Sequence, residues 1–161
     1  MPLKLLKRKL KTLKNPAYNE QRLNPNINSY RKAANQGDAE AQFNLGLTYK
    51  EGQEVQQDNK MAAKWYQKAA QQDHITAQFN LGLLYQDGKG VEQDFASAVK
   101  WYQKAAEQDH ITAQFNLGLL YQDGKGIRQN KTNAKEWYGR ACDGGLQLGC
   151  DSYRELNEQG Y

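Results

Sequence analysis

The feature that most constrains this chain is an internal repeat of 36 residues. The stretch 77–112 reads AQFNLGLLYQDGKGVEQDFASAVKWYQKAAEQDHIT, and near-copies lie directly before it at 41–76 and directly after it at 113–148. The central copy is identical to the preceding copy at 25 of 36 positions and to the following copy at 19 of 36. Such a period indicates one supersecondary unit formed several times, each unit burying its apolar face against its neighbours.

Each copy predicts a pair of helices. In the first half of the central copy, Ala77, Leu81 and Tyr85 recur at helical spacing, and the second half carries a Trp-Tyr pair among alanines at the same spacing. Between the halves, the Gly-Lys-Gly turn that starts at Gly88 supplies left-handed backbone, and Asp94 stands where the next helix needs an N-cap. The chain has no run of alternating β-branched residues that would predict a strand. The expected fold class is all-α, a right-handed α/α solenoid of helix hairpins with 36-residue repeats.

The repeat register also sets the expected domain boundaries. Tyr30 aligns with Tyr66 one period later, so 27–35 is predicted to be the second helix of an incomplete leading unit. At the other end Arg154 takes the position of Gly118, so the last helix is expected to close the stack. We expect a basic arm and linker at 1–27, a repeat domain at 28–161 with full repeats at 41–76, 77–112 and 113–148, and partial caps at 28–40 and 149–161.

The positive charge of the chain is concentrated in its first 14 residues. They hold six Lys or Arg residues and no acid, which leaves 16 of the 22 basic side chains against all 18 acidic ones in the rest. Nucleic-acid binding needs cations clustered on the folded surface, so we expect no nucleic-acid partner. The leucines among these basic residues leave three alternatives open: a solvated arm, a helix docked on the repeats, or an adaptor that lies on an anionic membrane surface.

No apolar run of signal-peptide length follows these charges, and no stretch is apolar enough to span a bilayer. The absence of a signal peptide leads us to expect a cytoplasmic protein.

The recurring residues resemble a known family. The pattern A-x-x-x-L-G-x-x-Y-x-x-G-x-G-V, then D, then A-x-x-W-Y-x-x-A-A, resembles the Sel-one-like repeat, a relative of the tetratricopeptide repeat, over about 28–160. The resemblance implies an α/α solenoid that commonly serves as an adaptor in protein complexes. By itself it implies no chemistry.

Three glycines in helix interiors predict close helix contacts. Gly46, Gly82 and Gly118 each occupy a position where Gly costs about 1 kcal/mol relative to Ala, so a close approach between helices must offset the loss. We expect the Trp-Tyr pairs at 65–66, 101–102 and 137–138 to be core residues that fill the space between hairpins.

Cys142 and Cys150 are the two cysteines of the chain. Ala141-Cys142 and Gly149-Cys150 resemble the local pattern of the cysteine-rich bacterial branch of the family, in which such a pair ties neighbouring helices together. That resemblance makes the two residues a disulfide candidate and would place the protein in the periplasm or outside the cell. Two buried free thiols are the alternative.

No catalytic or metal-binding constellation is recognisable. His74 and His110 are equivalent residues in Asp-His-Ile-Thr connections one repeat apart, where we expect loops and too great a separation for a shared metal. The Gly-Lys-Gly turns lack the spacing of a phosphate-binding loop, and no nucleophile with an adjacent base is evident. We therefore expect no catalytic residue, no metal site and no cofactor.

A second apolar face on the first helix of each unit is the candidate binding surface. At about 100° per residue from Leu45, Ala41 and Tyr49 lie near it, whereas Phe43 and Leu47 lie on the opposite side. We call the six residues of this face the Phe–Leu ladder: Phe43, Leu47, Phe79, Leu83, Phe115 and Leu119. Three asparagines border it: Asn44, Asn80 and Asn116.

By resemblance to tetratricopeptide proteins this face lines a concave groove, and side-chain amides suit the donors and acceptors of a peptide backbone. The alternative is that the phenylalanines and leucines are simply buried between units.

These observations favour a non-enzymatic scaffold, which we expect to be a monomer, that binds a protein or peptide partner through the Phe–Leu ladder. One alternative is a periplasmic protein that binds or hydrolyses β-lactams like the cysteine-rich relatives. Another is a membrane-surface adaptor that attaches through residues 1–14.

Overall fold

A computed structural model of the chain describes residues 25–52 and 54–161. In this part of the chain the regular structure is entirely helical. The helices are α3 (Pro25–Asn35), α4 (Ala39–Glu51), α5 (Asn59–Ala70), α6 (Ile75–Asp87), α7 (Phe95–Ala106), α8 (Ile111–Asp123), α9 (Lys131–Asp143) and α10 (Gln147–Glu158). The predicted all-α solenoid is confirmed.

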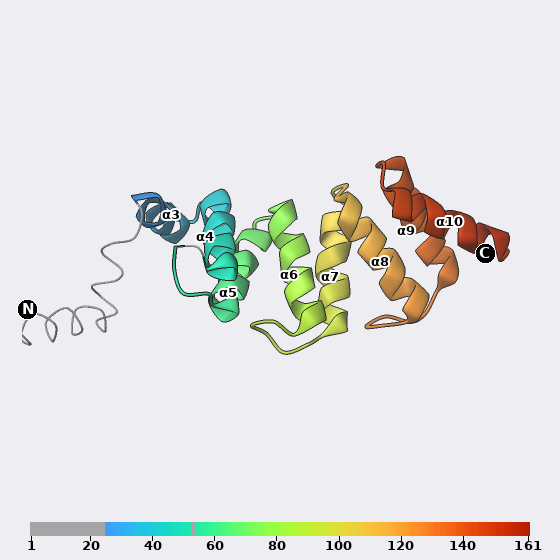
Figure 1. Cartoon of the computed structure of the whole chain (residues 1–161), viewed down its shortest axis with the longest axis horizontal. Coiled ribbons are helices and arrows are strands. Elements are labelled where there is room, and N and C mark those ends of the chain that lie inside the picture. The colour runs from blue at the N-terminus through green and yellow to red at the C-terminus, as the bar shows by residue number, and fades with distance from the viewer. Residues whose placement is uncertain (1–24, 53) are drawn as a thin grey trace, which may run out of the picture.

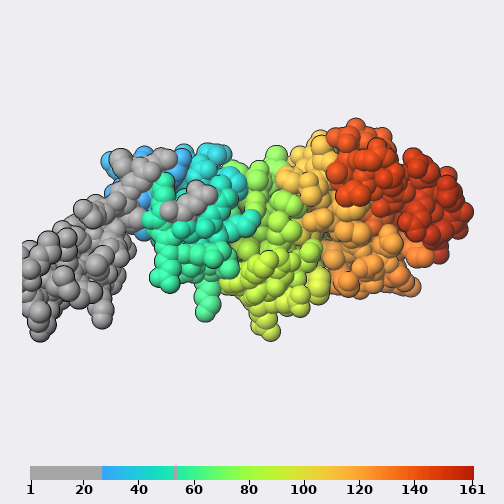
Figure 2. Space-filling model, in the orientation of Figure 1, coloured from blue at the N-terminus to red at the C-terminus, as the bar shows by residue number. Residues whose placement is uncertain are grey.

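The helices form a single elongated row in chain order (Figure 1). Each helix packs against the one before and the one after it, and the hairpins α4–α5, α6–α7 and α8–α9 correspond to the three full repeats. In the space-filling view the successive units follow one another as bands along the long axis (Figure 2). The core is therefore a ribbon along the row, shared between neighbouring units.

The turn inside the central hairpin has the predicted caps. Gly88 ends α6 with a left-handed φ of 66°, and its N–H donates to the carbonyl of Leu84. Asp94 precedes α7, and its carboxylate accepts hydrogen bonds from the backbone N–H groups of Ala96 and Ser97. Only a residue that tolerates positive φ ends the first helix without strain, which explains the glycine.

The interior glycines allow the two helices of each hairpin to touch. A Cβ atom added at Gly82 would lie 2.7 Å from Cδ1 of Tyr102, on the facing helix. A Cβ atom added at Gly46 would lie 2.6 Å from Cδ1 of Tyr66, and one added at Gly118 would lie 2.7 Å from Cδ1 of Tyr138. All three tyrosine residues are fully buried, so each glycine makes room for an aromatic ring.

The three tyrosines, Trp65 and Trp101 are buried, whereas Trp137 is only partly buried. Tyr102 contacts Gly82 inside its own hairpin and also packs in a cluster with Ala113 and Leu117 of the following unit, as predicted. Trp101, by contrast, belongs to a buried cluster with residues of α5 and α6, such as Ala69 and Leu81, and so reaches the preceding unit. Adjacent residues on a helix point about 100° apart, and the two rings therefore serve two different contacts.

Helix α3 starts the described part of the solenoid. Its Ile27 is 0% exposed and packs in a cluster with Leu45 and Trp65. The proposed division of the chain at 27–28 stays a prediction, since residues 1–24, with the basic arm, lie outside the described part.

The Gly–Tyr contact predicts an unusual response to alanine. Gly82→Ala would place a methyl group 2.7 Å from the Tyr102 ring and should lower the free energy of unfolding by about 1–2 kcal/mol, because overpacking outweighs the gain in helix propensity. The matched control is Gly139→Ala in α9, where the new Cβ would lie 3.3 Å from the exposed ring of Tyr153, which has room to shift. That variant should be neutral or more stable by up to about 1 kcal/mol. Chemical denaturation measures both, and equal effects would contradict the packing argument.

Candidate functional site

The Phe–Leu ladder lies partly at the surface. Phe43, Phe79 and Phe115 are half-buried, and so are Leu47 and Leu83. Leu119 is 38% exposed. Each of these side chains therefore packs partly against the core and exposes part of its surface to solvent.

Each phenylalanine packs against a buried tyrosine, and two of the three also stack on a histidine. The Phe79 ring lies 5.8 Å from that of Tyr102 in the same hairpin and stacks at 4.4 Å on the imidazole of His110, which begins the next unit. Phe43 makes the same two contacts, at 5.8 Å with Tyr66 and 4.7 Å with His74. The ladder is therefore anchored to the core on one side, and each of these two rungs joins consecutive units.

The histidines have a structural role that sequence reasoning missed. His110 is the N-cap of α8, and its Nδ1 accepts a hydrogen bond of 3.2 Å from the N–H of Ala113. This acceptor role needs a neutral imidazole. Burial lowers the pKa of His110, which favours that neutral form at physiological pH. His74 caps α6 in the same way, and its Nε2 lies 3.1 Å from a carboxylate oxygen of Glu40.

The asparagines at the edge of the ladder already make internal hydrogen bonds. Asn80 donates through Nδ2 to the carbonyl of Thr76 at 2.8 Å, and its Oδ1 accepts from Lys50 Nζ at 3.1 Å. Asn44 donates to Glu40 at 3.3 Å. A side-chain amide has two N–H donors and two acceptor lone pairs, so capacity for a further partner remains.

The first unit differs from the other two beneath the ladder. The hydroxyl of Tyr102 donates to Gln86 at 3.0 Å, and that of Tyr138 donates to Gln122 at 2.7 Å. Lys50 occupies the corresponding position in the first unit, and the buried Tyr66 hydroxyl has no hydrogen-bond partner among the described residues. The ammonium group of Lys50 bonds to Asn80 instead, so it links the first helices of two consecutive units.

Sequence reasoning also missed a buried glutamine in each unit. Gln42, Gln78 and Gln114 are at most 4% exposed. The helical angle that placed Ala41 and Tyr49 on the packed side puts Gln42 on that side as well, at about 60° from Leu45. The same calculation was therefore sufficient to find it.

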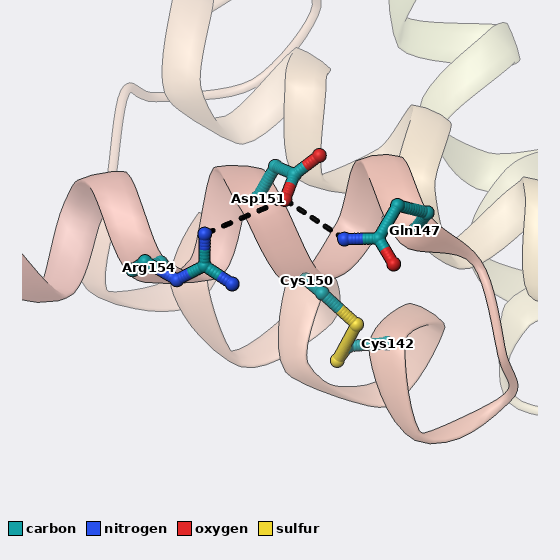
Figure 3. The surroundings of a disulfide bond; sticks show 5 residues. All are labelled: Cys142, Gln147, Cys150, Asp151 and Arg154. Atoms are coloured by element: carbon teal, nitrogen blue, oxygen red, sulfur yellow. Dashed lines mark hydrogen bonds and ion pairs between the residues drawn. A yellow bond between two sulfur atoms is a disulfide. The ribbon is translucent and has the colours of Figure 1, made fainter.

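The C-terminal cysteines are joined across two helices. Cys142 in α9 and Cys150 in α10 form a disulfide with a Cα–Cα distance of 4.5 Å (Figure 3). Next to it, the Asp151 carboxylate accepts a hydrogen bond from Gln147 and pairs with Arg154. Such a short loop corresponds to a stabilisation of about 2–3 kcal/mol.

The described residues contain no group of three His, Cys, Asp or Glu side chains that could hold a metal ion. Within the same part of the chain, no helix combines the length and apolar character needed to cross a membrane.

Comparisons with known proteins agree with this architecture. The family model described as Sel1 repeat matches residues 30–38, 39–74, 75–110 and 111–146. This chain belongs to the Sel1 repeat family. It is the family inferred above as Sel-one-like, and its repeat boundaries coincide with the helix hairpins.

Solved structures of Sel1 repeat proteins have the same fold. A Sel1 repeat protein from Oxalobacter formigenes is 39% identical with a TM-score of 0.75, and the match covers 78% of this chain and 51% of that one. A protective antigen of uropathogenic Escherichia coli with an SLR fold is 33% identical with a TM-score of 0.75, covering 86% of this chain and 34% of that one. This chain thus spans about half of the first relative and a third of the second.

The cysteine-rich protein B of Helicobacter pylori, at 24% identity and a TM-score of 0.61, shares the fold. That match covers 78% of this chain and 90% of the other. A comparison with curated proteins found no significant match. The Sel1 repeat fold is typical of non-enzymatic scaffolds that bind protein partners.

The capping role of His110 predicts a pH-dependent stability. Because the pKa of His110 is lowered in the folded protein, the unfolded chain takes up a proton at higher pH than the folded one. Stability should be unaffected above the ordinary pKa near 6.5 and should decrease as the pH falls below it. In His110→Asn an amide oxygen still caps the helix but does not titrate.

Urea unfolding at about pH 7.5 and about pH 5.5 measures this effect in both proteins. We expect the wild type to lose more stability between the two conditions than His110→Asn. An identical loss in the two proteins would show that His110 does not contribute.

Proposed function

We propose that this Sel1 repeat chain is a non-enzymatic scaffold that binds an extended segment of a protein partner along the Phe–Leu ladder, on the concave side of the solenoid. The observation that carries the proposal is the partial exposure of equivalent phenylalanines and leucines in three consecutive units. The half-buried side chains leave apolar surface at the same place in each of the three units, where a partner can contact it.

The chemistry of the ladder edge supports an extended peptide as the ligand. Alternate side chains of such a segment would contact the apolar rungs, while its backbone N–H and C=O groups would bond to the asparagine amides. The hydrogen bonds from Lys50 and to Thr76 fix the orientation of the Asn80 amide. Binding of a partner would therefore cost little side-chain entropy at Asn80.

The central unit provides the sharpest test. We expect Phe79→Ala and Asn80→Ala each to weaken partner binding by about 1–3 kcal/mol, as anchors in a partly desolvated patch do. Asn80→Ala should lose at most about 1 kcal/mol of stability, because its bonds to Thr76 and Lys50 are partly solvated. Phe79→Ala should also lose stability, because its ring contacts Tyr102 and His110.

The experiment is affinity capture from the native organism, followed by binding measurements with the purified partner. Gln103→Ala, on the exposed side of α7, is the matched control and should bind like the wild type. A partner whose affinity is unchanged by both ladder variants would place the interaction surface elsewhere, and Glu51, Asp87 and Asp123 would be examined next.

The two other functions stay predictions. The membrane-surface adaptor depends on residues 1–14, outside the described part of the chain. For the β-lactam alternative we can assign no nucleophile, and incubation with a chromogenic β-lactam tests it. Turnover that persists through repurification would contradict the scaffold-only function.

A further inference from the structure

The buried glutamines form a regular hydrogen-bonding pattern at the junctions between units. Gln78 in α6 donates through Nε2 to the carbonyl of Ala70, at the end of the preceding helix α5, and Oε1 accepts a bond of 2.8 Å from Nε2 of Gln108. Gln42 makes the equivalent bonds, to Ala34 and from Gln72, the latter also at 2.8 Å. In both units a carboxamide inserted from the turn after the second helix satisfies the buried amide oxygen.

The third unit lacks this inserted carboxamide. Gln114 donates to the carbonyl of Ala106 at 3.2 Å, as its counterparts do. Gly144 stands at the position equivalent to Gln72 and Gln108 in the third repeat, and it has no side chain. Gln114 is 3% exposed, and its Oε1 has no hydrogen-bond partner among the described residues. A buried acceptor without a partner costs about 1–3 kcal/mol.

An open surface pocket of about 470 Å³ lies at this position. It is lined by Asp109, Ile111, Gln114, Arg140, Asp143 and Gly144. The guanidinium of Arg140 is held over the Trp137 ring, 4.6 Å from its centroid. The lining therefore combines a buried acceptor, two carboxylates and one cationic donor group.

We propose that this pocket binds a primary carboxamide, the group that the protein itself places there in the two preceding units. The N–H groups of the ligand would donate to Gln114 Oε1 and to a carboxylate of the lining, and its carbonyl would accept from Arg140. An alkylammonium ion would find acceptors in Gln114 Oε1 and the carboxylates, but it has no acceptor atom for the Arg140 guanidinium. A carboxylate would leave Gln114 Oε1 without a donor.

Entry of the ligand requires a small movement of Ile111. A Cβ atom at position 144 would lie 2.7 Å from Cγ1 of Ile111, so this side chain leans into the space that an inserted group would use. Ile111 is 37% exposed and therefore has room to turn away. The site is separate from the Phe–Leu ladder, and the proposal does not depend on the ladder binding a partner.

Nuclear magnetic resonance of the full chain tests the proposal, with the signals of the Gln114 side-chain amide and the Ile111 methyl groups as readout. The probe is N-acetyl-glutamine N-methylamide, and the glutamate and lysine analogues are the comparisons. We expect saturable shifts with the glutamine probe and at least about tenfold weaker binding of the other two. Tighter binding of the lysine probe, or no saturable shift with the glutamine probe, would overturn the proposal.

Three variants locate the site. Gln114→Met removes the unpaired oxygen and should weaken binding of the glutamine probe at least about tenfold. Gln78→Met is the matched control, because it loses the equivalent bond to a helix carbonyl in the central unit. In that unit Gln108 already occupies the place of the ligand, so this variant should bind the probe like the wild type. Gly144→Gln restores the inserted carboxamide on right-handed backbone, with φ −73°, and should abolish binding while the chain stays folded. Unchanged binding in both Gln114→Met and Gly144→Gln would overturn the proposal.

Free L-glutamine identifies the source of the carboxamide. Binding as tight as that of the capped probe would support a free amino acid as the ligand. Binding of the capped probe alone would support a glutamine side chain of a partner protein. Either result supports the carboxamide chemistry.

Discussion

Within each full hairpin a glycine of the first helix faces a buried tyrosine ring of the second and leaves it room. A Cβ at Gly46, Gly82 or Gly118 would come within 2.6–2.7 Å of that ring, far inside normal contact. The buried tyrosine in turn supports the phenylalanine of the ladder, whose ring centroid lies 5.4–5.8 Å away. The position of the candidate binding face therefore depends on this one contact, repeated three times. A change in the glycine would propagate to the surface through two packed rings.

Departures from the repeat indicate where the units acquire individual properties. Lys50 replaces the glutamine that bonds the tyrosine hydroxyl in the other units, and its ammonium group bonds to Asn80 in the next unit. Gly144 replaces the glutamine that satisfies a buried amide, and an open pocket lies beside it. A solenoid gains stability from identical neighbours, so positions that give up a repeated bond are the informative ones for function. Both departures involve a polar group of the interior or of the ladder edge.

Much of the fold was predictable from the sequence, because the period of 36 residues aligned glycines, caps and aromatic residues in three independent copies. The caps at Gly88 and Asp94 are confirmed for this reason. The direction of each ring was not predictable in the same way: Tyr102 clusters with residues of the following unit, whereas Trp101 clusters with residues of the preceding one. Contacts between side chains far apart in the sequence, such as Phe79 on His110, depend on how one unit stacks on the next. The missing partner of Gln114 likewise became evident only once the paired glutamines were seen in space.

A double-mutant cycle on Gly82 and Tyr102 tests the central contact most directly. In the wild-type background Gly82→Ala adds a methyl group that collides with the ring, whereas Tyr102→Leu removes the ring and leaves space for that methyl group. The free energies of unfolding should therefore be strongly non-additive, with Gly82→Ala neutral or stabilising in the Tyr102→Leu background and a coupling energy of about 2 kcal/mol. If Gly82→Ala costs the same in both backgrounds, the glycine does not serve the tyrosine, and the position of the candidate binding face does not depend on their contact.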